Sequence, residues 1–352
     1  MNLKLKHYDE LDGVRAIAVI MVMLYHFFQD ITTTNEILII VKKLSLFGKT
    51  GVSLFFVLSG FLITRILINT KEKSSYFRSF YARRVLRIFP LYYIFLIIYY
   101  FIFPLFVGKS FAGFSEQIWY WIFMQNFALT FDWKSFGPTH YWSLAVEEHF
   151  YLFWPLIIYY STLKRIKWAI LILFIISFLT RIILIRNNFE ESQFTFSRFD
   201  ELAIGSLLAV LELENKLVTR HLKKITLVFL IFLAPLAYIS FKNGSYSLFD
   251  SSIRHLILGI FYGSFIAIVI TAGASSLIKK LLNRNYLRFI GKISYGLYVY
   301  HPLCFVIINN YIGSTSIVIN FTLSFGFAFI ISVLSYNLIE KKFLKLKNKF
   351  SY

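Results

Sequence analysis

The sequence predicts an all-α membrane protein, a polytopic bundle of about ten transmembrane helices with both termini in the cytoplasm. Of its 352 residues, 58% are hydrophobic and 20% aromatic, while only 16% are charged. Such a composition, with a mean hydropathy of +0.65, is too apolar for a soluble domain of this size. The apolar residues form runs long enough to cross a bilayer, and the basic residues gather between the runs.

The expected spans follow one another with short connections along the whole chain. They cover residues 14–28, 48–67, 90–107, 141–161, 168–185, 199–211, 225–241, 253–274, 293–311 and 317–339. The sixth is the shortest, and the first lacks the small-residue cleavage site of a removed signal peptide. Because no polar stretch could form a second core, we expect one transmembrane domain over residues 1–352, with a basic tail at 341–352.

The positions of the basic residues predict the orientation. Lys and Arg cluster at 69–89, 164–167, 220–224, 279–292 and 341–349, which all fall on one side of the expected spans. Cytoplasmic loops carry this excess, so that side is cytoplasmic and the number of spans is even. The aromatic stretch 118–131 is a rival span, but counting it would place the basic turn 164–167 outside. We therefore expect it to be an interfacial or re-entrant segment on the outer face.

Other classes of protein fit the sequence less well. The formal charge of +19 does not indicate a nucleic-acid partner, because the cations lie in short loops between apolar runs. The one cysteine, Cys304, lies within an apolar run and excludes a disulfide framework. We find no Cys or His cluster with metal-ligand spacing and no Gly-rich phosphate loop, so we expect no metal site.

Two ionisable residues lie in the first expected span. Arg15 and His26 are eleven residues apart, which is three helical turns, so they share one helix face about 16 Å apart. Ionisable groups inside a membrane are costly and commonly functional. Arg15 could instead reach the cytoplasmic interface and His26 could be a hydrogen-bonded packing residue. The shared face favours a site in which His26 acts as a general base toward a hydroxyl group.

Six sequence blocks occur in order along the chain. They are Arg15 with His26 after ten residues, 51–63 (GVSLFFVLSGFLI), 84–87 (RVLR) before Pro90, 142–151 (WSLAVEEHFY), 198–200 (RFD) with Gly205, and 294–298 (SYGLY) with His301 and Pro302. In these blocks the chain resembles the bacterial acyltransferase-3 family of integral membrane O-acyltransferases. The resemblance is to the stand-alone type, since no esterase-like extracytoplasmic domain follows the last expected span.

The resemblance implies an activity and its partners. An acyl group, expected to be acetyl, would pass from cytoplasmic acyl-CoA to a hydroxyl of an envelope or exported carbohydrate. Acyl-CoA is then a donor substrate and no bound cofactor is expected. The implied partners are acyl-CoA, a carbohydrate or glycolipid acceptor, membrane lipid and polysaccharide-biosynthesis proteins, and the implied location is the bacterial cytoplasmic membrane. Whether transfer is direct or passes through an acyl-enzyme on His26 or Tyr298 stays open.

The resemblance also implies roles for residues. His26 would be the base, and Arg15 would bind or polarise the donor. Independently of the resemblance, His140, Ser143, Glu147 and Tyr151 fall at helical spacing, which predicts one polar face from which Glu147 could support His26 or Arg15. Arg84 and Arg87, one helical turn apart and flanked by Arg83, form a fork suited to phosphates, although such a cluster also occurs in ordinary cytoplasmic loops. The further substrate-binding candidates, several of which could equally be contacts between helices, are Trp142, Ser143, Tyr151, Arg198, Asp200, Ser294, Tyr298 and His301.

Two other functions use the same residues. A transporter or flippase for an anionic or sugar-linked substrate would use the buried charges for binding alone. A catalytically silent partner of a polysaccharide polymerase would need neither Arg15 nor His26. Release of coenzyme A from acyl-CoA distinguishes an acyltransferase from both.

Overall fold

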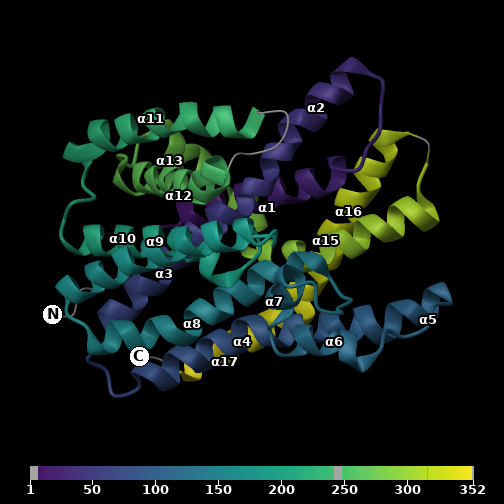
Figure 1. Ribbon diagram of the computed structural model, residues 1–352, viewed down its shortest axis with the longest axis horizontal. Coiled ribbons are helices and arrows are strands. Elements are labelled where there is room, and N and C mark those ends of the chain that lie inside the picture. The colour runs from purple at the N-terminus through teal and green to yellow at the C-terminus, as the bar shows by residue number, and fades with distance from the viewer. Residues whose placement is uncertain (1–6, 242–247, 315, 351–352) are drawn as a thin grey trace.

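The protein is a bundle of long helices packed side by side (Figure 1). The structure, a computed structural model, describes residues 7–241, 248–314 and 316–350, and this part of the chain contains helices and no strand. Its first half comprises α1 (Glu10–Phe28), α2 (Glu36–Leu46), η1 (Phe47–Thr50), α3 (Gly51–Thr70), α4 (Tyr76–Ile97), η2 (Ile98–Ile102), α5 (Phe103–Val107), α6 (Phe114–Trp121), α7 (Gln125–Thr130), η3 (Thr139–Tyr141) and α8 (Trp142–Tyr160).

The second half continues the same architecture. It comprises α9 (Leu163–Arg186), α10 (Thr195–Leu213), η4 (Thr219–His221), α11 (Leu222–Phe241), α12 (Leu248–Thr271), α13 (Leu277–Leu282), α14 (Asn285–Lys292), α15 (Ser294–Ile307), η5 (Ile308–Ile312), α16 (Ile317–Ser335), η6 (Tyr336–Glu340), α17 (Lys341–Leu346) and η7 (Lys347–Lys349). Every apolar run predicted from the sequence coincides with one of these helices.

Seven helical stretches in the described residues are long and apolar enough to cross a membrane. They are Glu10–Phe28, Glu36–Thr70, Tyr76–Val107, Leu163–Arg186, Thr219–Tyr238, Leu248–Thr271 and Ile317–Lys349. The other three predicted spans lie on α8 and α10, which carry several charged residues, and on α15, which has 14 residues. The fold is therefore that of a multi-pass helical membrane protein, whereas the count of ten spans stays a prediction.

The stretch 118–131 does not form one span. It is divided between α6, of eight residues, and α7, of six, and the chain turns between them where Phe123 has a φ of 60°. Neither helix is long enough to cross a bilayer. The helix α2 was not predicted, and it leads through η1 into α3.

The helices differ in how much of their apolar surface the protein covers. Two thirds of the apolar stretch of α3 and of α12 is buried, but only 6% of that of α11 and 17% of that of α16. The apolar side chains that α11 and α16 leave uncovered are suited to lipid. At the centre, α3 packs so closely on α10 that a Cβ at Gly60 or at Gly205 would lie 2.0 Å from a carbonyl oxygen of the other helix. The two helices can approach this closely because glycine has no side chain.

At one end of the bundle, basic residues join segments that are far apart in the sequence. Glu10 pairs with Lys279 at 2.8 Å, and Asp9 pairs with Arg288 at 3.0 Å. Near the C-terminus the Phe350 carbonyl accepts a hydrogen bond from Arg83 at 3.2 Å. We call this the basic end of the bundle; its assignment to the cytoplasm stays a prediction.

Candidate active site

The first of two cavities lies toward the basic end. It has a volume of about 230 Å³ and is called the inner cavity. Its polar lining comes from α1, α3, α4, α8, α15 and the C-terminal segment, and consists of Arg15, Ser59, Arg84, Arg87, Ser143, Glu147, Glu148, Tyr151, Ser294, Tyr295, Tyr298 and Lys347. Four of these side chains are basic and two are acidic, so the cavity is suited to an anionic ligand.

The second cavity, of about 180 Å³, lies toward the opposite end and is called the outer cavity. Its walls come from the end of α1, the junction of η1 and α3, the start of α8, the loop before α10, and α15. They consist of Val22, Tyr25, His26, Gln29, Lys49, Val52, Thr139, His140, Trp142, Gln193 and Tyr298. Amide, hydroxyl and aromatic side chains predominate, which is a lining suited to a hydroxyl-bearing ligand.

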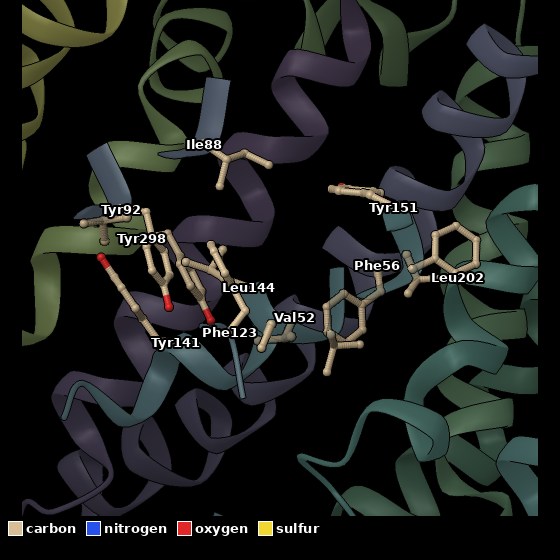
Figure 2. Close-up of a cluster of buried hydrophobic side chains, with 14 of the residues drawn as sticks. Val52, Phe56, Ile88, Tyr92, Phe123, Tyr141, Leu144, Tyr151, Leu202 and Tyr298 are labelled. Atoms are coloured by element: carbon tan, nitrogen blue, oxygen red, sulfur yellow. The ribbon is translucent and has the colours of Figure 1, made fainter. Parts of the chain in front are cut away.

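Val52 and Tyr298 line both cavities. Figure 2 shows both side chains within the same buried cluster, together with Phe56 and Leu144, which line the inner cavity. The Tyr298 hydroxyl donates to the His140 carbonyl at 2.9 Å and lies 2.5 Å from the Ser143 hydroxyl. Its position is therefore determined by α8 and the turn before it, and the two cavities adjoin at Val52 and Tyr298.

In the inner cavity the arginines and glutamates come from different helices. The Arg84 guanidinium lies 5.5 Å from the centre of the Tyr151 ring, while Arg15 pairs with Asp12 at 2.7 Å. Glu147 hydrogen bonds to Ser59 and Tyr151, whose hydroxyls also bond to each other. Since these contacts hold Glu147 in place, its carboxylate faces the arginines of α4 rather than His26.

His26, which lines the outer cavity, is hydrogen bonded to a second histidine, His301, which lies behind it. His26 Nδ1 lies 2.9 Å from His301 Nε2, and His301 Nδ1 lies 2.9 Å from the Leu297 carbonyl oxygen. Proline has no N–H group, so Pro302 cannot donate a helix hydrogen bond to the Tyr298 carbonyl one turn earlier. The His301 ring bonds to this carbonyl in addition to that of Leu297. The His-Pro sequence thus supplies both a free carbonyl and the imidazole that bonds to it.

These contacts determine which ring nitrogens carry protons. A carbonyl oxygen only accepts, so His301 Nδ1 is the donor. In neutral His301, Nε2 is then an acceptor, and His26 Nδ1 must donate to it. His26 Nε2 is left with its lone pair. His140 lies beside this pair, with its ring centre 5.6 Å from that of His301 and its Nε2 3.2 Å from the Val299 carbonyl oxygen.

The structure brings most of the sequence-predicted site residues together. Arg15, Arg84, Arg87, Ser143, Glu147, Tyr151, Ser294 and Tyr298 line the inner cavity. His26, Trp142 and Tyr298 line the outer cavity, and His301 lies behind His26. Arg15 and His26 thus belong to adjoining cavities rather than to one.

Besides His301, three predicted residues lie outside both cavities. Arg83 donates to the Phe350 carbonyl, away from Arg84 and Arg87. Arg198 pairs with Glu201 at 2.7 Å and lies over Trp142, at 5.2 Å from the ring centre. Asp200 pairs with Arg181 at 2.8 Å, and both side chains are 1% exposed. These contacts hold helices together, which favours the structural interpretation of Arg198 and Asp200.

Several residues of the cavities were not found by sequence reasoning. Gln193 lies in a connection between expected spans and Lys347 in the basic tail. Lys49 and Val52 lie at the start of the expected span 48–67, but neither was singled out as a site residue. Arg181, the partner of Asp200, was detectable as an ionisable residue within an expected span. Among the described residues, no group of three or more His, Cys, Asp or Glu side chains is arranged to hold a metal ion.

The chain is similar to known proteins over most of its length. The family model described as "Acyltransferase domain" matches residues 8–337. The peptidoglycan O-acetyltransferase OatA of Listeria monocytogenes is 30% identical over 84% of this chain and 49% of its own length. The O-acetyltransferase OatA of Staphylococcus aureus is 29% identical over 86% of this chain and 51% of its own length. The chain spans about half the length of these curated relatives. No solved structure matches it.

Proposed function

This chain belongs to the acyltransferase-3 family, and from that premise we propose that it transfers an acetyl group from acetyl-CoA to a hydroxyl of an envelope carbohydrate. In this proposal ten helices span the bacterial cytoplasmic membrane and both termini are cytoplasmic. Such an orientation follows from the basic loops that gather at the end of the bundle where the inner cavity lies. The related OatA proteins are named as O-acetyltransferases, and one of them as acting on peptidoglycan.

One observation carries the proposal: an arginine-rich cavity and a histidine-containing cavity adjoin at Val52 and Tyr298 within one bundle. A transmembrane transferase needs a donor site open to one face and an acceptor site open to the other. The reacting atoms must still come together. Two adjoining cavities on opposite sides of a shared wall meet both requirements.

The inner cavity is proposed as the donor site. Coenzyme A carries phosphates at one end and a thioester at the other, joined by a narrow pantetheine arm. Arg84 and Arg87, supported by Lys347, would bind the phosphates at the basic end. The arm would then follow the apolar part of the lining, and its thioester would lie near Tyr298 and Arg15. A positive charge beside the carbonyl stabilises the negative charge that develops on its oxygen.

The outer cavity is proposed as the acceptor site, with His26 as the base. As the acceptor oxygen bonds to the thioester carbon, His26 Nε2 takes the hydroxyl proton. The carbon–sulfur bond then breaks with its electron pair on sulfur. The leaving thiolate receives the proton from His26, so that the products are an acetyl ester and free coenzyme A. His301 Nε2 accepts from His26 Nδ1 throughout and stabilises the imidazolium that forms.

The direct test uses the purified full chain in proteoliposomes. Labelled acetyl-CoA is supplied on one side and a soluble oligosaccharide on the other, and both acetylated sugar and free coenzyme A are measured. Wild-type protein should form the two products in equal amounts, and His26→Ala should lower the rate about 10²- to 10⁴-fold, the usual contribution of a general base.

Measuring acetyl-CoA binding by the same variant distinguishes a loss of catalysis from a loss of donor binding. Because His26 lies outside the inner cavity, acetyl-CoA binding should persist in His26→Ala. Wild-type transfer by this variant would contradict the role of His26. Movement of sugar across the membrane without release of coenzyme A would instead indicate a transporter. Label retained on the protein after denaturation would indicate an acyl-enzyme.

A further inference from the structure

Four polar side chains that line the outer cavity have no partner among the described residues. The Lys49 ammonium and the side-chain amides of Gln29 and Gln193 line it, as does the Thr139 hydroxyl. Within residues 7–241, 248–314 and 316–350, none of these four groups makes a side-chain hydrogen bond or an ion pair. By contrast, His26, His140 and Tyr298, in the same cavity, are all bonded. Groups left free around a cavity are those that a ligand can bind.

The neutral part of this lining suits a sugar ring. Two amides and one hydroxyl supply both donors and acceptors, which a ring with several hydroxyl groups can use. Tyr25 and Trp142 add aromatic faces, against which the C–H groups of a sugar can pack. A cavity of about 180 Å³ holds one such ring and leaves the rest of a chain outside.

Lys49 adds a charge that a neutral sugar does not require. The segment η1 that carries it is held tightly against α1, because a Cβ at Gly48 would lie 2.0 Å from the Met21 carbonyl oxygen and 3.2 Å from Tyr25 Cβ. Lys49 is therefore held beside the turn of α1 that carries Tyr25 and His26. Its position relative to the proposed base is determined by the packing of two helices.

The charged groups around Lys49 do not neutralise it. Glu190 and Glu191 act on it electrostatically, but Arg198 and Arg254 act in the opposite direction. The Glu190 carboxylate accepts from Ser192, and neither glutamate lies within 4.0 Å of the ammonium. Burial also raises the pKa of Glu191, which weakens its charge as a counter-ion. Lys49 is exposed at the cavity and is thus available to an anionic ligand.

We infer that the outer cavity binds an acidic carbohydrate, one whose carboxylate or phosphate contacts Lys49 while a hydroxyl on the same or the adjoining ring faces His26. This inference rests on the proposed function, because it names the class of acceptor for the same transfer. Gln29, Gln193 and Thr139 would hydrogen bond to the ring, and Tyr25 and Trp142 would pack against it. The charge of the acceptor then determines which hydroxyl reaches the base.

Binding is the closing measurement, because it does not depend on acetyl transfer. The full chain in detergent is titrated with two pairs of probes. The first pair is a neutral N-acetylglucosamine tetrasaccharide and a tetrasaccharide of alternating N-acetylglucosamine and glucuronate, and the second is N-acetylglucosamine and N-acetylglucosamine 1-phosphate. Wild-type protein should bind an anionic probe at least about tenfold more tightly than its neutral counterpart, as expected for a charge-assisted hydrogen bond. Whether the carboxylate or the phosphate shows this preference identifies the source of the charge.

Variants of Lys49 test the contact itself. Lys49→Gln should abolish the preference without changing the affinity for the neutral probe, Lys49→Arg should keep most of it, and Lys49→Glu should reverse it. Lys43→Gln is the matched control, since Lys43 is an exposed lysine of α2 that does not line the cavity. Equal wild-type affinity for all probes, or an equal loss in Lys43→Gln, would overturn the inference. If wild-type protein prefers the anionic probes but no acetyl transfer is detected, the proposed function is wrong, whereas the inference that the outer cavity binds an acidic carbohydrate is supported.

Discussion

The Nδ1 atom of His26 lies 2.9 Å from the Nε2 atom of His301, and His301 in turn bonds through Nδ1 to the Leu297 carbonyl. Because the carbonyl only accepts, this chain of hydrogen bonds places the proton of His26 on Nδ1 and leaves Nε2 as its basic atom. His301 is 0% exposed and does not line either cavity. We therefore expect it to act through His26, as a positioning residue.

Variants of His301 should show this dependence. His301→Leu removes the acceptor, so His26 can adopt the other tautomer or rotate, and the rate of transfer should fall about 10- to 100-fold, the usual effect of losing such a supporting partner. His301→Gln offers an amide oxygen in place of Nε2 and should recover part of the rate. The measurement is the maximal rate as a function of pH, together with KM for acetyl-CoA, which should stay near the wild-type value.

A purely structural role for His301 predicts another pattern. Both variants would then lose thermal stability and rate together, the pH profile would keep its shape, and glutamine would give no more activity than leucine. That result would remove His301 from the mechanism and leave the role of His26 unaffected.

The arginines of α4 offer a comparison within a single helix. Arg84 and Arg87 line the inner cavity, whereas the adjacent Arg83 donates to the Phe350 carbonyl. Replacing Arg84 and Arg87 with alanine should weaken coenzyme A binding about 100-fold or more, since each charge-assisted contact to phosphate contributes about 1.5–3 kcal/mol. Arg83→Ala should change the affinity little. The measurement is equilibrium binding of coenzyme A, and an equal loss in all variants would indicate a general effect of charge.

The Arg181–Asp200 pair should affect stability rather than catalysis. Both side chains are 1% exposed and their charged atoms lie 2.8 Å apart. Asp200→Asn leaves the guanidinium of Arg181 without its counter-charge and should destabilise the folded protein by about 3–5 kcal/mol. The double variant Arg181→Met with Asp200→Leu should recover much of this loss. Thermal unfolding in detergent measures the stability of the single and the double variant. If Asp200→Asn has normal stability but no activity, Asp200 acts in the site rather than in the fold.

Val52 should limit the length of the acyl group. It lines both cavities, so its side chain lies where the acyl end of the donor would reach the acceptor. Val52→Ala should raise the ratio of butyryl to acetyl transfer about tenfold, within the range seen when a pocket gains room for a methylene group. Val57→Ala on the same helix, buried but outside both cavities, is the control. A similar change in both variants would place acyl selection elsewhere.

Much of the fold was predictable because a backbone within lipid must form its hydrogen bonds internally, which favours helices. Each apolar run of sufficient length became helical. The stretch 118–131 was correctly separated from the spans on charge alone, although its division at Phe123 depends on local backbone geometry. The helix α2 was missed because its sequence of 11 residues lies next to a longer apolar run.

The candidate site was predictable in part. Helical spacing correctly grouped Ser143, Glu147 and Tyr151 on one face of α8, since residues three and four apart are neighbours. The same spacing could not assign partners across helices. Glu147 was expected to support His26, but its contacts are with Ser59 and Tyr151, and His26 is bonded to His301. Contacts between residues far apart in the chain depend on how the helices pack.

The sequence by itself determined the class of fold, the positions of the helices, the basic end of the bundle and the residues that carry charge. These properties depend on the transfer of side chains between water and lipid, which acts on each segment separately. The tertiary structure alone decided that Arg15 and His26 line different cavities, that Val52 and Tyr298 lie between them, and that His301 sets the tautomer of His26. Those relationships depend on close packing at Gly60 and Gly205 and on hydrogen bonds between distant helices, which no single segment encodes.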